Sequence, residues 1–164
     1  RTWVMDDVFS TFERGEITSE QYYRHFCHLM DIDIPFDTFV EGWCAIFGDV
    51  ALEVVDAMQR LRRSMPVVAL TNTNVIHQSV WAERYADALE HFDAVYASNE
   101  IGLRKPEPQC FAHVLSQHNA SAAETIFFDD TELNVVAARA LGIHGVLVAE
   151  PASVPAALND LQIW

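Results

Sequence analysis

The apolar positions in the first third of the chain recur every three or four residues, the spacing of amphipathic helices. Thr18 followed by Gln21 fits a capping box, and Pro35 suits a first helical turn. Residues 51–63 form a further amphipathic stretch with a basic end, as a helix C-terminus favours. No convincing strand precedes residue 64, so a helical region is predicted. Its apolar positions include Tyr22, Tyr23, Phe26, Leu29, Met30, Phe36, Phe39, Val40, Trp43 and Phe47.

The pattern changes after Pro66, where short continuous apolar runs replace the helical spacing. Such runs are typical of strands that are buried on both faces. Strand and helix then alternate, which predicts a right-handed α/β fold with a parallel sheet. The expected strands are residues 67–70, 94–97, 125–128 and 145–148, and the expected helices are residues 75–85, 108–118, 132–141 and 154–161.

Composition narrows the classes of partner and compartment. Ten Lys and Arg residues against 24 Asp and Glu residues give a net charge of −14, which disfavours nucleic acids and anionic membranes. No apolar run approaches the roughly 18 residues of a membrane span. The three cysteines, Cys27, Cys44 and Cys110, show no CxxC spacing and fit a reducing compartment. We expect a soluble, cytoplasmic protein without nucleic-acid or membrane partners.

Four small polar residues, Thr71-Asn72-Thr73-Asn74, follow the first expected strand. Ligands of parallel sheets collect at the carboxyl ends of the strands. A hydroxyl, a carboxamide and free N–H groups there could hold a phosphoryl oxygen. Taken alone, the stretch favours the simpler alternative, in which these residues cap the next helix. Neither GxGxxG nor GxxxxGK[ST] occurs, so phosphate would have to be held without these loops.

Lys105 is the only lysine, because the other nine basic residues are arginines. A compact ammonium group can neutralise a phosphate and order a carboxylate. Pro106 and Pro108 fix the backbone around it and open the following helix. The alternative is an ordinary surface lysine in a sequence that is biased towards arginine.

Asp129-Asp130 follows the third expected strand and precedes a helix that begins near Glu132. Two neighbouring carboxylates at the end of a buried strand repel each other, and a divalent cation relieves that repulsion. Mg²⁺ is typically held by one or two carboxylates, water and substrate phosphate. The alternative is that one aspartate caps the helix, and both roles can coexist.

In this order, Thr71-Asn72, Lys105-Pro106 and Asp129-Asp130 resemble the second, third and fourth motifs of the haloacid dehalogenase-like hydrolases. The chain is most similar to the alpha-glucose-1-phosphate phosphatase type of small bacterial sugar phosphatases. The resemblance extends over the whole chain and implies a Rossmann-like parallel sheet with an N-terminal helical cap. The expected domains are a cap over residues 1–62 and a core over residues 63–164.

The resemblance also implies an activity: hydrolysis of a small phosphorylated metabolite through an aspartyl-phosphate, with Mg²⁺ as cofactor. Thr71 and Asn72 would bind the phosphoryl group, and Thr71 and Lys105 count as catalytic. Lys105 would also bind phosphate and balance its charge. Asp129 and Asp130 would bind the metal, with Asp130 the more direct ligand.

The first family motif, DxDx[TV] after an apolar strand, is absent from the 164 residues. Asp31-Ile32-Asp33 has the spacing but follows a helix, and Asp6-Asp7 has no strand before it, so both are interpreted as decoys. The missing strand would lie between residues 67–70 and 125–128 and carry the nucleophile. We therefore expect a fragment, or a chain completed by another chain or by altered pairing, that does not turn over substrate by itself. An incomplete sheet also favours a homo-oligomer.

Two other functions remain open. A non-catalytic binding or scaffolding protein with the same fold would bind phosphate or a partner without turnover. A dehalogenase would need no metal, and the Asp129-Asp130 pair argues against it. The sequence does not name the substrate. Trp43 and Phe47 of the cap are interpreted as core residues rather than sugar-stacking ones.

Overall fold

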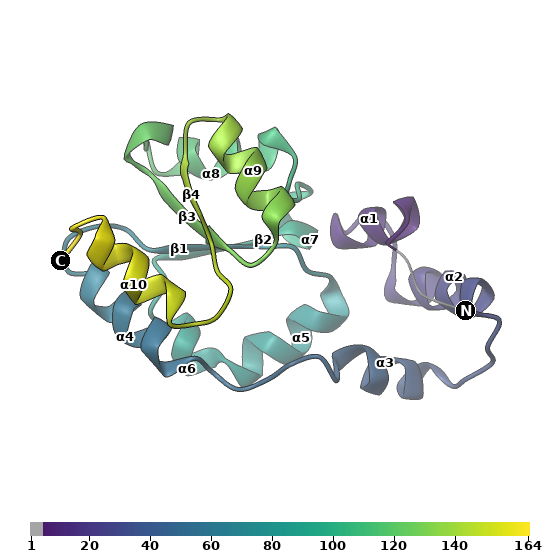
Figure 1. Ribbon diagram of the computed structural model, residues 1–164. Coiled ribbons are helices and arrows are strands. Elements are labelled where there is room, and N and C mark those ends of the chain that lie inside the picture. Colours follow the sequence, from purple (N-terminus) through teal and green to yellow (C-terminus); the bar gives the residue numbers. More distant parts are fainter. Residues whose placement is uncertain (1–4) are drawn as a thin grey trace. The chain divides into compact units, whose positions relative to one another are not determined.

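The computed structural model describes residues 5–164, so the first four residues of the predicted cap lie outside the described part (Figure 1). The residues pack into two compact units, each built from several stretches of the chain. Of the described residues, unit 1 contains 5–49, 70–89 and 95–104, and unit 2 contains 50–69, 90–94 and 105–164. The boundary predicted between residues 62 and 63 remains a prediction.

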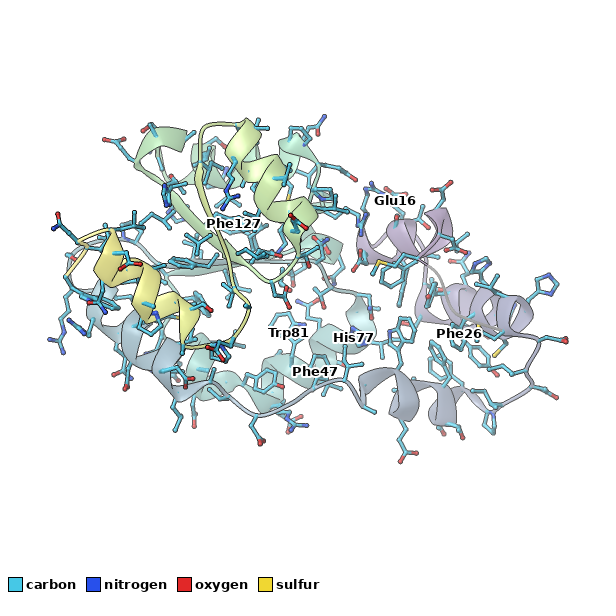
Figure 2. All side chains as sticks on the ribbon, viewed as in Figure 1. Glu16, Phe26, Phe47, His77, Trp81 and Phe127 are labelled. Atoms are coloured by element: carbon cyan, nitrogen blue, oxygen red, sulfur yellow. The ribbon has the colours of Figure 1, made fainter. Side chains whose placement is uncertain are left out.

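Unit 1 begins with three helices, α1 (Asp7–Glu13), α2 (Ser19–Met30) and α3 (Phe36–Cys44). Asp6 caps α1, and Thr18 and Gln21 form the predicted capping box at the start of α2. A largely aromatic hydrophobic cluster holds the three helices together, and its buried members are Phe9, Phe12, Tyr22 and Phe39, with Ile76 added from a later helix. Trp43 packs against this cluster, as the core interpretation predicted. Figure 2 labels Phe26, which lies on the same cluster.

Four more helices and two strands complete the middle of the chain. They are α4 (Leu52–Leu61), β1 (Val68–Thr71), α5 (Val75–Arg84), α6 (Ala86–Leu89), β2 (Ala94–Ala97) and α7 (Ser98–Ile101). β1 pairs with β2. Among residues 5–64 the structure shows helices and no strand, as the sequence predicted.

Unit 2 contains a β–α–β arrangement that carries the best-defined part of the candidate site. Its elements after residue 105 are α8 (Pro108–Gln117), the 3₁₀ turn η1 (Ala122–Glu124), β3 (Ile126–Asp129), α9 (Glu132–Ala140), β4 (His144–Leu147) and α10 (Ser153–Asp160). β3 and β4 are parallel, with Ile126 opposite His144. α9 lies against both strands (Figure 1). A Cβ on Gly145 would lie 3.0 Å from the Val135 carbonyl oxygen, so glycine permits this close approach.

A second, smaller core joins the two ends of unit 2. α10 packs on α4 through Ala57, Val154 and Leu158, all of them buried. The guanidinium of Arg60 lies 4.1 Å from the ring centroid of Trp164, a cation–π contact at the end of the chain.

The four strands lie within one residue of their predicted positions, and the α/β class is confirmed. Within residues 5–164 the strands form two separate pairs, β1 with β2 and β3 with β4, and no strand joins the pairs. This agrees with the expectation that the 164 residues lack a central strand. None of the helices in the described part has the length and apolarity that a membrane span requires. The three cysteines are free thiols.

Candidate active site

A buried ion pair stands at the carboxyl end of β3. The Lys105 ammonium donates to Asp129 Oδ2 at 2.7 Å, and the two side chains are 11% and 5% exposed. The Lys105 Nζ also lies 5.5 Å from the centroid of the Phe127 ring. Phe127, labelled in Figure 2, belongs to the same strand as Asp129. The only lysine of the chain is therefore not a surface residue, and its charge is directed at one of the two predicted metal ligands.

The other carboxylate oxygen of Asp129 also accepts hydrogen bonds. Its Oδ1 accepts from the Thr131 backbone N–H at 2.8 Å and from the Asn134 amide at 3.0 Å. Burial by itself would raise the pKa of Asp129, but the hydrogen bonds from Lys105, Asn134 and Thr131 outweigh it and lower the pKa below its ordinary value. The carboxylate is thus kept ionised and fixed in orientation.

Asp130 is the more accessible carboxylate of the pair. It is exposed, and its Oδ1 accepts one long hydrogen bond, 3.4 Å from the Thr131 hydroxyl. Three hydrogen bonds already occupy Asp129, so Asp130 has more lone pairs to offer to a cation.

The donor set fits Mg²⁺ as a two-carboxylate site. In the described part of the chain no group of three or more His, Cys, Asp or Glu side chains is arranged for a metal. Mg²⁺ does not need one, because it usually takes one or two carboxylates and completes its shell with water and phosphate. Asp130 would be the direct ligand, with Asp129 beside it.

The polar loop after β1 contains residues that stabilise the local structure and residues that were predicted to bind phosphate. Asn74 caps α5 by accepting from the His77 backbone N–H at 3.1 Å, so the capping interpretation holds for this residue. Thr73 is buried and bonded to Ser98 and Trp81. Thr71 and Asn72 are half-buried, and the Thr71 hydroxyl is 3.5 Å from the Asn72 carbonyl oxygen. Neither Thr71 nor Asn72 caps α5, and these are the two residues that were predicted to bind phosphate.

A second buried ion pair lies immediately before Lys105. Arg104 donates from Nε and Nη2 to Glu13 Oε2, at 2.8 and 2.7 Å. Glu13 ends α1, and the following Gly15 approaches α7 so closely that a Cβ would lie 2.3 Å from the Asn99 carbonyl oxygen. Gly15 has φ +71°, which glycine adopts without strain. Arg104, the residue before Lys105, is therefore anchored to the end of α1 within unit 1.

The structure brings Lys105 and Asp129 into direct contact and places Asp130 next to them. Thr71 and Asn72 belong to unit 1, and their convergence on this pair remains a prediction. The two decoy motifs behave as expected: Asp31 ends α2 in the left-handed region, with φ 57°, and Asp6 caps α1 and pairs with His25. Neither lies at the end of a strand.

Two residues that support the candidate site were not predicted from the sequence. Asn134 lies in the first turns of α9, five residues after Asp129, where a polar side chain on the helix face towards the strand end could have been noticed. Ser98 follows β2 directly, the same strand-end position that singled out the other candidates.

The comparisons identify the class of protein that this fold and site represent. The chain matches the family model described as haloacid dehalogenase-like hydrolase over residues 13–142. It belongs to this family, and the predicted resemblance is confirmed.

Two of the proteins that the chain is similar to are named as phosphatases. The chain is 43% identical over 165 residues to sesquiterpene phosphatase astK of Aspergillus oryzae, which covers 98% of the chain and 82% of the relative. It is 26% identical over 143 residues to D-ribitol-5-phosphate phosphatase of Bacteroides thetaiotaomicron, with 84% and 69% covered. A HAD family enzyme of that bacterium, solved with magnesium and inorganic phosphate, superimposes with a TM-score of 0.73 at 27% identity, covering 85% of this chain and 73% of that one.

Proposed function

We propose that the chain contributes the cap and the second, third and fourth motifs of a Mg²⁺-dependent phosphatase that acts on a small phosphorylated metabolite. The observation that carries this proposal is the buried Lys105–Asp129 pair at the end of β3. Burying two charges is costly, and the pair brings together the only lysine and a candidate metal ligand. The two relatives named as phosphatases support the same class of reaction.

The proposed roles follow from the needs of phosphoryl transfer, which depends mainly on positioning and charge neutralisation. Thr71 donates its hydroxyl and Asn72 its carboxamide to the oxygens of the transferring group. Lys105 neutralises that group and the attacking carboxylate, which an aspartyl-phosphate mechanism assigns to the DxDx[TV] motif. Asp129 keeps the lysine oriented.

Asp130 and Asp129 would hold Mg²⁺, which when bound supplies positive charge against the phosphate oxygens. The hydrogen bonds from Thr131 and Asn134 keep Asp129 ionised for this purpose. A solved relative contains magnesium and inorganic phosphate together, which supports the same pairing here.

The part of the substrate other than its phosphate group would lie in a cavity of unit 1. A cavity of about 440 Å³ is lined by both apolar and polar side chains, among them Phe12, Glu16, Val75 and Asn99. Val75 directly follows the polar loop at the start of α5. This volume lies within the range of small-molecule sites, about 300–1,000 Å³, and supports a small metabolite as substrate.

The test is hydrolysis of p-nitrophenyl phosphate by the complete gene product, with and without Mg²⁺. We expect activity that a chelator abolishes and added Mg²⁺ restores. Lys105→Met should lower kcat/KM by about 10²–10³-fold, the usual cost of losing a group that stabilises transition-state charge. Arg63→Met removes an exposed cation elsewhere and serves as the matched control.

Two results would contradict the proposal: an inactive complete protein, or a Lys105→Met variant with the rate of the parent. Phosphate binding without turnover would favour a non-catalytic HAD-fold protein. Activity that resists chelation would favour a metal-independent hydrolase instead. The 164-residue chain alone should bind but not turn over, because it contains no DxDx[TV] motif after an apolar strand.

A further inference from the structure

Ser98 is a buried polar residue at the junction between β2 and α7. It follows β2, begins α7 and is 0% exposed. Its hydroxyl accepts from the Thr73 backbone N–H at 2.9 Å and donates to the Thr73 carbonyl oxygen at 3.0 Å. A single side chain thus bonds both backbone polar groups of Thr73.

The need for such a contact follows from the position of Thr73. β1 ends at Thr71 and the N-cap of α5 is Asn74, so Thr73 stands between a strand and a helix while being only 3% exposed. A buried backbone N–H or C=O without a partner destabilises the folded state, because it loses the hydrogen bond to water that it makes in the unfolded chain. Ser98 meets this requirement by reaching across from a segment 25 residues away.

The Thr73 side chain is fixed too. The indole N–H of Trp81, which Figure 2 labels, donates to the Thr73 hydroxyl at 2.9 Å from the second turn of α5. With Asn74 capping the helix, the second half of the loop is held by Ser98, Trp81 and the start of α5. The first half, Thr71 and Asn72, carries the proposed phosphate contacts.

We propose that Ser98 is a positioning residue for the phosphoryl-binding loop: its two hydrogen bonds to the Thr73 backbone set where Thr71 and Asn72 meet the phosphoryl group. This role rests on the proposed phosphatase function. Ser98 does not touch the substrate. It acts through the loop, whose groups must be placed within a fraction of an ångström for phosphoryl transfer, because a misplacement of about 1 Å can cost about a hundredfold in rate.

The test compares variants of the complete gene product in kcat and KM for p-nitrophenyl phosphate, and in inhibition by inorganic phosphate. Ser98→Ala should lower kcat by about ten- to a hundredfold, change KM less, and weaken phosphate inhibition. Ser98→Cys keeps a weak donor and acceptor close to the position of the hydroxyl and should restore part of the rate.

Two controls separate positioning from loss of stability. Ser79→Ala removes a hydroxyl that donates only within its own helix, to the Ile76 carbonyl oxygen at 2.8 Å, and should leave the kinetics unchanged. Val154→Ala trims the buried core of unit 2 and lowers the melting temperature without touching the loop. All assays are made well below the melting temperature of each variant, and if Ser98→Ala does not fold, Ser98→Cys carries the comparison.

The proposal is overturned if the Ser98 variants melt earlier but keep the parent's kcat, KM and phosphate inhibition, while the parent enzyme is active. In that case Ser98 only stabilises the fold, and the phosphatase function stands. If the parent neither hydrolyses the ester nor is inhibited by phosphate, the proposed function and the positioning role fail together.

Discussion

The environment of Lys105 shows how one residue can be held against its own solvation preference. Its side chain is 11% exposed, so the ammonium group has lost most of its hydration. The Asp129 carboxylate at 2.7 Å and the face of Phe127 offset part of that loss. Hydrophobic replacements of such pairs often match them in stability, so a buried pair is weak support for a purely structural role. Under the proposed function the Lys105 charge binds an anion, which would explain why this cost is accepted.

Lys105→Met should destabilise the protein by about 3–5 kcal/mol at neutral pH, because it leaves the Asp129 carboxylate buried without its counter-ion. The loss should shrink in acid, since protonation then neutralises Asp129. Urea unfolding at pH 7 and near pH 4 measures both. The double variant Lys105→Met/Asp129→Leu should recover part of the stability, and an unchanged loss in the double variant would contradict the pairing.

His77 is a neutral histidine in a defined tautomer. Its Nε2 lies 2.9 Å from the Trp43 carbonyl oxygen and must donate, while its Nδ1 lies 3.3 Å from the Asn74 amide nitrogen and must accept. Asn74 Oδ1 is already used by the His77 backbone, which fixes the amide orientation. Stacking on Trp43 and an edge contact with Phe47 enclose the ring (Figure 2).

This geometry predicts a pH dependence of stability. Burial lowers the pKa of His77, and the hydrogen bond to Trp43 offsets only part of that shift. The folded state therefore binds fewer protons than the unfolded state, so the contribution of His77 is present above the unfolded pKa, about 6.5, and declines as the pH falls below it. The melting temperature should fall more between pH 7.5 and 5.5 in the parent than in His77→Phe, which keeps the stacking.

The charged residues of the candidate site were easier to predict from the sequence than the residues that hold them in place. Lys105 and Asp129 could be predicted because each is unusual in the sequence. Lys105 is the only lysine, and Asp129 belongs to a double aspartate after an expected strand. Asn134 and Ser98 are ordinary residue types whose importance lies in a three-dimensional partner, and a single sequence does not show which residue faces which.

At the scale of elements, local signals placed the helices well and the strand ends within a residue. The capping box of α2 is visible as Thr18 and Gln21 and is formed as predicted. β1 begins one residue later than the apolar run, because Asp93 takes both backbone groups of Val67: its carboxylate accepts from the Val67 N–H at 2.8 Å and its own N–H donates to the Val67 carbonyl oxygen at 2.7 Å. Such tertiary contacts decide strand ends and leave no local mark.

Thr18→Ala should lower the unfolding free energy by about 1 kcal/mol, the usual value of an N-cap. The Thr18 hydroxyl accepts from the Gln21 N–H at 3.2 Å, and the reciprocal bond from the Thr18 N–H measures 2.8 Å. Chemical denaturation checks the loss. Thr38→Ala, an exposed site inside α3, should cost nothing, because alanine is the better helix former.

The Glu13–Arg104 pair ties the end of α1 to the residue before Lys105. Arg104→Met leaves the Glu13 carboxylate, 8% exposed, without this partner and should cost about 3 kcal/mol. Glu13→Gln/Arg104→Met should cost less than the sum of the single changes. A double-mutant cycle by thermal unfolding measures the coupling, and strictly additive losses would show that the pair contributes no net interaction.

At the scale of the whole molecule, charge is the dominant feature. A net charge of −14 on 164 residues implies self-repulsion across the surface. Added salt should therefore raise the melting temperature, with most of the gain between about 0.02 and 0.2 M NaCl, where the screening length falls below about 10 Å. Replacing the exposed Glu41 and Glu53 by Gln should reduce this gain, and a melting temperature that falls with salt would contradict the expectation.

The solitary buried lysine also makes the protein its own spectroscopic reporter. Reductive methylation with isotope-enriched formaldehyde would label this lysine as the one reactive side chain of the 164 residues, since the arginines do not react. Once its NMR resonance is distinguished from that of a methylated terminal amine, it would follow the occupancy of the neighbouring acidic pair as magnesium or phosphate is titrated in.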